Sequence, residues 1–164
     1  MKKLLFLSVI AIAFTMNTFG QSSATATATA VIVSPISISS TVDLSFGNII
    51  ADTDGGTVTI APDDTRTLTG LTSPSITGTI TAASFDVTGL DGSTYSITLP
   101  ASHTISSGGN NMTVDTFTST PSGTGTLTGG TSTLNVGATL NVGASQPAGT
   151  YTNGAGFTVT VNYN

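Results

Sequence analysis

The chain has 164 residues, no cysteine, and eight acidic against three basic residues, which gives a formal net charge of −5 at pH 7. After Lys3 the only basic side chains are Arg66 and His103. Nucleic acid binding is therefore excluded, because it needs several Lys or Arg side chains to neutralise phosphates. The lack of cysteine also excludes disulfide bonds and thiolate metal sites.

The first twenty residues have the layout of a secretory signal peptide. Lys2 and Lys3 precede an apolar run over residues 4–14, and small residues stand at the −3 and −1 positions if cleavage falls before Gln21. The run is shorter than the roughly 20 residues that a membrane-spanning helix needs. We therefore expect residues 1–20 to be a signal peptide, with cleavage after Ala24 or Ala26 as the alternative.

The remaining residues, 21–164, are expected to form a single domain that passes through the periplasm and is secreted or displayed at the cell surface. No second apolar stretch follows the signal, so we expect no membrane insertion after cleavage.

After the signal, apolar and polar residues alternate with the period of a β-strand. Residues 24–33 read Ala-Thr-Ala-Thr-Ala-Thr-Ala-Val-Ile-Val, and the even-numbered face continues past Pro35 through Ile36 and Ile38. The Asp91-Gly92 step between two alternating runs predicts a hairpin. The further strands expected before residue 100 cover residues 42–46, 57–60, 66–71, 76–81, 84–88 and 95–99.

The alternation persists to the C-terminal end. Met112 and Val114 share a phase that breaks at Phe117, which predicts a β-bulge there. Strands are expected around residues 134–136 and 140–142, and the chain closes with an alternating run over residues 157–163. Because many short strands are separated by Gly, Pro, Ser and Asn turns, we expect an all-β antiparallel sandwich.

Threonine occupies most of the polar positions of these strands. It is β-branched and suits an extended backbone, while its hydroxyl suits water. Charged residues make up only 7% of the chain. Charged side chains commonly keep edge strands from pairing with other chains, so the terminal strands here are expected to be open to such pairing.

Residues suited to catalysis are few. His103 is the only histidine, and no Gly-x-Ser-x-Gly nucleophile elbow is present. We therefore expect no enzyme and no cofactor, the alternative being an exported hydrolase that depends on His103. Asp52 and Asp54 before Gly55 resemble the start of a calcium loop, but the later ligands are missing, so turn-forming aspartates without a metal are expected.

Several motifs together resemble a known family. They are Asp43-Leu44-Ser45-Phe46-Gly47-Asn48-Ile49, Tyr95-Ser96-Ile97-Thr98-Leu99-Pro100, Gly149-Thr150-Tyr151 and the final run Phe157-Thr158-Val159-Thr160-Val161-Asn162-Tyr163. With Ala26-Thr27-Ala28 and Gly137-Ala138-Thr139-Leu140, they are similar to the bacterial secreted family catalogued as domain of unknown function 4402. That family in turn resembles the spore-coat-protein-U and archaic chaperone–usher pilin domains.

The resemblance implies an immunoglobulin-like sandwich that lacks a strand and is completed by an N-terminal extension of another subunit. The implied partners are other copies or related subunits, together with a periplasmic chaperone. Residues 24–32 would be either this donor strand or the domain's own first strand. The residues expected to pair in assembly are Ala24, Ala26, Ala28, Ala30, Ile32, Phe157, Val159, Val161 and Tyr163.

Two functions therefore remain open from the sequence. The leading expectation is a secreted or cell-surface structural or adhesive protein, with pilin-like assembly by strand complementation. The alternative is a monomeric extracellular module that binds a ligand or glycan through loops such as residues 106–111 and 119–125. Because the segment before residue 35 is short, completion of the sandwich by the chain's own N-terminal segment also remains open.

Overall fold

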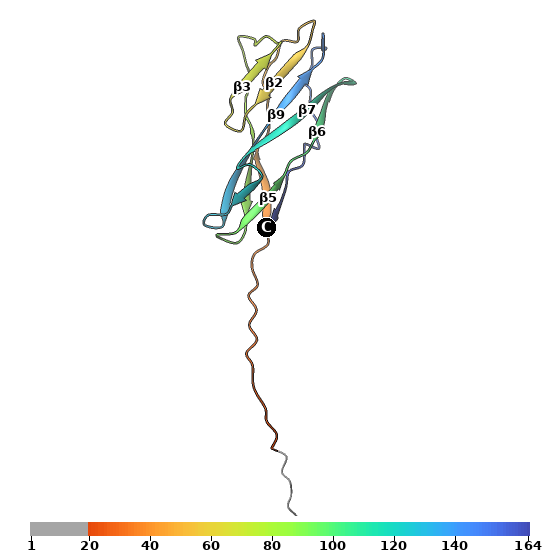
Figure 1. Cartoon of the computed structure of the whole chain (residues 1–164). Coiled ribbons are helices and arrows are strands. Elements are labelled where there is room, and N and C mark those ends of the chain that lie inside the picture. Colours follow the sequence, from red (N-terminus) through yellow and green to blue (C-terminus); the bar gives the residue numbers. More distant parts are fainter. Residues whose placement is uncertain (1–19) are drawn as a thin grey trace, which may run out of the picture. The chain divides into compact units, whose positions relative to one another are not determined.

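A computed structural model describes residues 20–164, and this part holds ten β-strands and no helix (Figure 1). The expected signal peptide, residues 1–20, lies outside the described residues apart from Gly20 and stays a prediction. In residues 20–164 no helix is long and apolar enough to cross a membrane. The strands all lie in one compact unit, Val33–Asn164, while residues 20–32 belong to a separate unit, are exposed and form no strand.

Seven strands form one antiparallel sheet, with the long strand β9 (Thr131–Val142) at its centre. One edge of β9 pairs first with β4 (Ala83–Thr88) and then with β2 (Gly56–Ile60). The sheet continues outward from β4 to β1 (Ser37–Val42) and from β2 to β3 (Arg66–Thr69). The other edge of β9 pairs with β7 (Asn110–Thr120), which pairs with β6 (Ser102–Ser107).

A second antiparallel sheet contains β10 (Thr160–Tyr163), β5 (Thr94–Thr98) and β8 (Thr124–Thr126). The chain passes between the two sheets at Pro100, between β5 and β6, and at Pro121, between β7 and β8. Proline suits these points because it has no N–H to contribute to a ladder. The expected all-β antiparallel sandwich is confirmed.

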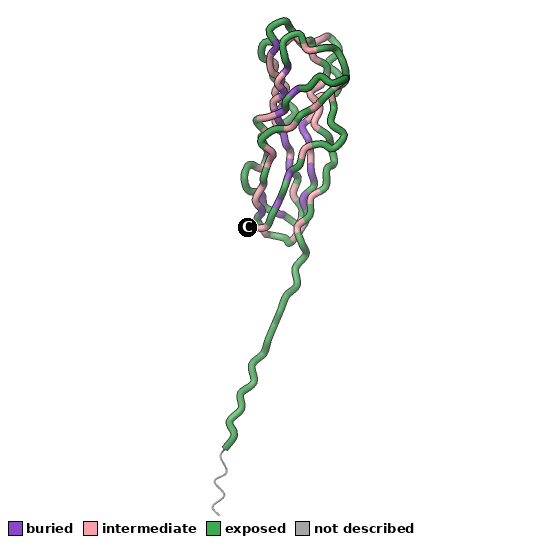
Figure 2. Tube along the Cα trace, turned by 90° about the vertical axis from the view of Figure 1, so that its right-hand side faces the viewer, coloured by how far each residue is buried: buried purple, intermediate pink, exposed green. Residues whose placement is uncertain are grey.

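One half of the compact unit has two complete layers. Val87, Leu134 and Val136 from the large sheet pack in one cluster with Tyr95 and Val161 from the small sheet. The Tyr95 side chain is fully buried, and its hydroxyl donates to Ser132 Oγ at 2.9 Å. Figure 2 shows buried residues along the inside of the unit.

The other half has one layer of sheet only. Its cluster is built from β2, β7 and β9, with Val58, Val114 and Leu140 nearly inaccessible to solvent. Partly buried residues from irregular segments cover this face, among them Phe46, Ile49 and Tyr151. These segments, residues 43–51 and 146–157, stand where a second sheet would lie, and this half of the sandwich is therefore incomplete.

Two strand expectations were wrong, each because of a turn. Residues 76–81 form no strand beyond a bridge from Thr81 to Ser45, since Gly78 adopts a φ of +69° and turns the chain. The Asp91-Gly92 turn forms, with a φ of +75° at Gly92, but β4 and β5 lie in different sheets. It therefore links the two layers and is not a hairpin turn.

The bulge expected at Phe117 is confirmed. The register between β7 and β9 shifts between Asp115 and Thr118, and Thr116 has a φ of +49°. The side chain of Phe117 can thereby pack against both clusters. The strand expected over residues 42–46 continues past β1 only as the bridge at Ser45.

Candidate functional site: an open groove over the core

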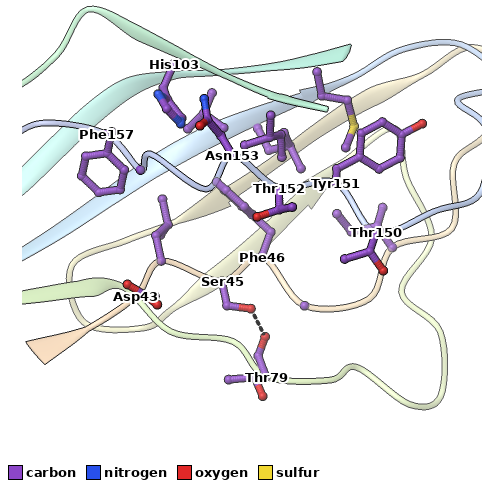
Figure 3. A pocket seen from close by; sticks show the side chains of 18 of the residues that line it. Asp43, Ser45, Phe46, Thr79, His103, Thr150, Tyr151, Thr152, Asn153 and Phe157 are labelled. Carbon is purple, nitrogen blue, oxygen red and sulfur yellow. Dashed lines mark hydrogen bonds between the residues drawn. The ribbon is translucent and has the colours of Figure 1, made fainter. Parts of the chain in front are cut away.

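A groove of about 1360 Å³ lies between the two irregular segments that cover the incomplete half of the sandwich (Figure 3). One wall is formed by residues 40–51 and the other by residues 146–157. The floor consists of side chains from the sheet behind them, namely Ala83, Phe85, Met112, Val114, Leu140 and Val142. The groove therefore leads directly onto the hydrophobic core.

Hydrogen bonds fasten the first wall to residues 79–81. Beyond β1, Ser45 and Thr81 exchange backbone hydrogen bonds at 2.9 and 3.1 Å. The hydroxyl of Ser45 donates to the carbonyl oxygen of Thr79 at 2.7 Å, as Figure 3 shows, and that of Thr81 donates to the carbonyl oxygen of Asp43 at 2.8 Å. β1 is an edge strand of the large sheet, so the backbone on its other side has no strand partner.

Arg66 holds the far end of this wall. Its Nη2 donates to the carbonyl oxygen of Asn48 at 2.7 Å, and Asn48 Nδ2 in turn donates to the carbonyl oxygen of Ile76 at 3.0 Å. Desolvation lowers the pKa of the Arg66 guanidinium. Within residues 20–164 its Nε and Nη1 are buried and have no hydrogen-bond partner. This end of the wall is therefore held by a partly buried cation together with backbone hydrogen bonds from Asn48 to Thr77 and from Ile50 to Thr72.

The second wall is attached at fewer points. Thr152 exchanges backbone hydrogen bonds with Ser106 on β6 at 3.0 and 3.1 Å. Asn153 Nδ2 donates to the carbonyl oxygen of Thr104 at 3.0 Å, and the Tyr151 hydroxyl donates to the carbonyl oxygen of Pro147 at 2.8 Å. The chain rejoins a sheet only at β10, which is itself an edge strand.

Aromatic side chains close the groove where the second wall approaches β10. The Phe157 ring lies 5.0 Å from that of Phe117 and 6.2 Å from those of Phe85 and His103, measured between ring centroids. These tilted and edge-on arrangements are the favourable ones for aromatic pairs. His103 and Phe157 lie next to each other on one side of the groove in Figure 3.

This arrangement suits an extended peptide. A strand lying in the groove would find the free edge of β1 beside it and an apolar floor beneath. Backbone hydrogen bonds would then provide affinity, and alternate side chains would enter the floor. Val42 lines the groove and is 42% exposed in the present structure, where no strand is docked.

His103 lies beside the aromatic side chains of the groove. Its side chain packs against Phe157 and lines the groove. Among residues 20–164, no three His, Cys, Asp or Glu side chains lie close enough together to hold a metal ion.

Asp52, from the calcium-like sequence, and the later pair Asp63 and Asp64 each accept a backbone N–H. Asp52 Oδ1 accepts the N–H of Thr53 at 2.6 Å. Asp63 Oδ1 accepts the N–H of Thr65 at 3.0 Å, and this hydrogen bond lowers the pKa of Asp63 below its ordinary value. Asp64 Oδ1 accepts the N–H of Ala82 at 2.6 Å.

The residues expected to pair in assembly fall into two groups. In the C-terminal group, Val159 and Val161 are buried and Phe157 and Tyr163 are partly buried, all packed in the same cluster. The N-terminal group, Ala24, Ala26, Ala28, Ala30 and Ile32, lies in the exposed segment without strands. Their part in assembly stays a prediction.

Tyr163 fixes the point at which the N-terminal segment joins the compact unit. Its hydroxyl donates to the carbonyl oxygen of Ser34 at 3.0 Å and accepts the N–H of Leu90 at 2.6 Å. Gly89 leaves room for the phenol, because a Cβ at this position would collide with the Tyr163 hydroxyl. Ser34 is thereby held beside the C-terminal strand.

Sequence reasoning missed both walls of the groove. Residues 47–51 and 146–156 read as turns, whereas residues 42–46 were expected to form a strand. One signal was available, since the alternation of the last strand stops at Asn153-Gly154-Ala155-Gly156 and is preceded by Gly149-Thr150-Tyr151. Such a break in a run of apolar alternation indicates a strand that leaves its sheet.

Comparisons with known proteins give one finding. A search of curated proteins and a search of solved structures found no match. The family model described as "Domain of unknown function (DUF4402)" matches residues 36–163. This range contains every strand and both walls of the groove. The chain therefore belongs to the DUF4402 family.

Proposed function

We propose that this chain is a secreted or cell-surface structural or adhesive subunit that assembles by β-strand complementation, in the manner of a pilin. The donor in this proposal is the N-terminal arm, residues 21–33, of another copy, and the acceptor is the groove. The observation that carries the proposal is the missing second layer over the β2, β7 and β9 cluster. The floor side chains are buried, and only partly buried residues of the two irregular segments lie over them, so a donor strand in the groove would supply the missing layer.

The arm has the properties of such an occupant. It is exposed and forms no strand, with Val31 at 81% and Ile32 at 98% exposure. It carries no charged residue and alternates alanine with threonine. A β-patterned segment without charges is prone to pair with a free strand edge. With Ala24, Ala26, Ala28, Ala30 and Ile32 facing the floor, Thr25, Thr27 and Thr29 would face water.

The resemblance to pilin domains supports the same proposal. The Leu44-x-Phe46-Gly47 motif lies in the first wall, and Gly149-Thr150-Tyr151 lies in the second. These are the motifs that resemble those of the spore-coat-protein-U and archaic chaperone–usher domains. In the proposal, a periplasmic chaperone covers the groove until the arm of another subunit replaces it.

We propose no catalytic role and no cofactor. The groove has an apolar floor, and the histidine that lines it packs edge-on against the ring of Phe157.

The arm and its deletion provide the test. The mature chain, residues 21–164, should form oligomers, and the chain lacking residues 21–33 should be a monomer that binds a synthetic peptide of residues 21–33. A peptide with Ile32→Asp is the matched control and should not bind, because a carboxylate would enter an apolar floor. Light scattering after size exclusion gives the masses, and fluorescence anisotropy gives peptide binding.

Equal masses for the two chains together with no peptide binding would contradict the proposal. If in addition a stable monomer bound glycans on an array, the alternative function, a monomeric extracellular binding module, would replace it.

A further inference from the structure

We infer that residues 153–159 form a strap that closes onto residues 99–105 when the groove is filled. The inference rests on the proposed function and assigns a moving part to the same groove. In the present structure the last strand is interrupted over these residues. It pairs with β6 at Thr152 and with β5 from Thr160 onward, and no ladder pair joins the segments between.

The register on the two sides of the interruption is the same. Thr152 lies opposite Ser106, and Thr160 lies opposite Thr98. The step along the chain from Thr152 to Thr160 equals the step from Thr98 to Ser106. The gap can therefore close residue by residue, without the slip that would turn every side chain to the other face.

The side-chain phase is also preserved across the gap. Tyr151 and Phe157 are both partly buried and packed on the core, and an even number of positions separates them. An extended strap would turn Asn153 and Ala155 toward the groove, in phase with both aromatic residues. Both are exposed in the present structure.

A local turn keeps the strap backbone out of a ladder with β6, which the strap contacts through the Asn153 side chain. The carbonyl oxygen of Asn153 accepts the N–H of Gly156 at 3.0 Å, and Asn153 Oδ1 accepts the N–H of Ala155 at 3.0 Å. Gly156 has a φ of +63°, which must become negative for an extended strand. A Cβ on Gly154 or Gly156 would meet no atom within 4 Å, so packing does not oppose the change.

The facing residues set how far closure can proceed. Among residues 20–164, residues 101–105 have no strand partner on this edge, because β6 pairs with β7 on the other edge, and the Thr104 carbonyl oxygen accepts a side-chain bond from Asn153. Pro100 would face Thr158 and has no N–H to donate. Closure therefore adds pairs from Asn153 opposite Ile105 to Phe157 opposite Ala101, and a gap remains at Pro100.

Filling the groove provides the driving force. With the groove empty, an extended strap would pair on the β6 side alone, and its other edge would face the groove. An inserted strand gives the strap a second partner, so that its backbone groups are paired on both sides. The first wall is already fastened through Ser45 and Thr81, and the strap is the wall that is free to move.

Disulfide trapping tests this closure, because the chain contains no cysteine of its own. The background is the mature chain with Ile32→Asp, whose own arm cannot fill a groove. The pair His103→Cys with Ala155→Cys lies in the closed register. The pair Ala101→Cys with Ala155→Cys is two residues out of register, and Ser106→Cys with Thr152→Cys lies at the existing bridge. Each is oxidised with and without the peptide of residues 21–33.

The peptide should accelerate formation of the 103–155 disulfide by about tenfold, since each new ladder hydrogen bond shifts the equilibrium severalfold. The 101–155 pair should not respond, and the 106–152 pair should oxidise in both conditions. In the chain with only Ile32→Asp, the peptide should also slow amide hydrogen exchange at Gly154, whose N–H would face Thr104 in the closed register. This measurement is independent of any effect of the cysteines on folding.

Peptide binding without a faster 103–155 disulfide or slower amide exchange would overturn the strap and leave the proposed function standing. A 103–155 disulfide that forms without the peptide as fast as the 106–152 disulfide would show that the strap closes over an empty groove, and would overturn its coupling to the groove. A peptide that does not bind would overturn both the strap and the proposed function.

Discussion

The phase of the N-terminal arm can be tested with two neighbouring residues, Ile32 and Val31. In the proposed assembly Ile32 faces the apolar floor and Val31 faces water. Both side chains are almost fully exposed in the isolated chain, at 98% and 81%. Replacing either with alanine should therefore leave the thermal stability of the monomer unchanged, and any effect on assembly reports on the docked arm.

The magnitude follows from the area that docking removes from water. Ile32→Ala deletes three carbons, each contributing about 0.8 kcal/mol when buried, or about 2.4 kcal/mol in total. At about 1.4 kcal/mol per factor of ten, binding of the arm peptide should weaken about 50-fold. Val31→Ala should change it by no more than about twofold, as for a surface position.

The assay is a titration of the groove with peptides of residues 21–33 carrying each substitution. A larger loss for Val31→Ala than for Ile32→Ala would show that the opposite face of the arm enters the groove, and the phase argued here would be refuted. Equal small effects would show that neither apolar side chain reaches the floor.

Three further predictions concern the fold. Gly125→Ala should lower the free energy of unfolding by about 1–3 kcal/mol or more, because the new Cβ would collide with the ring of Tyr95. The control Gly154→Ala meets no atom within 4 Å and should leave the chemical denaturation midpoint unchanged or raise it slightly. Tyr95→Phe should cost about 1 kcal/mol in the same denaturation assay, since a buried hydroxyl loses its hydrogen bond to a β9 serine; no change would contradict the bond. The lowered pKa of Asp63 means that its ionised form stabilises the fold above its ordinary value near 3.8 and that this contribution is lost as the pH falls. Asp63→Ala should thus destabilise less at pH 2 than at pH 7, and a pH-independent difference in melting temperature would contradict this.

The fold class follows from local pattern because strand periodicity is a local property. In β4, Phe85 and Val87 are buried while Asp86 and Thr88 are exposed, as their alternation predicts. The bulge at Phe117 could also be predicted from the sequence, since one extra residue changes the phase of the apolar positions.

The pairing of strands could not be read in this way. The sequence around Asp91-Gly92 fits a hairpin, but β4 and β5 pair with distant strands of different sheets. Such pairings depend on contacts far apart along the chain. The glycines at 108 and 109, both with positive φ, turn the actual hairpin between β6 and β7.

The groove was hidden for a related reason. Its floor residues, such as Met112 and Leu140, look like ordinary core positions in their strands. That no sheet lies over them is a property of the whole topology. The C-terminal wall gave a partial signal in its glycines, but the wall at residues 43–51 alternates like a strand at Leu44 and Phe46 and carries no such mark.

The central claim, that copies of this chain complete one another's sandwich, is tested most directly by the mass of the purified mature protein in sodium dodecyl sulfate before and after heating. An intermolecular strand held in the groove by backbone hydrogen bonds and an apolar floor should survive the detergent at room temperature. The account predicts a ladder of multiples of the monomer mass that collapses to the monomer on heating. The substitution Ile32→Asp should abolish this ladder. A single monomer mass under both conditions, with a monomer also in native solution, would contradict it.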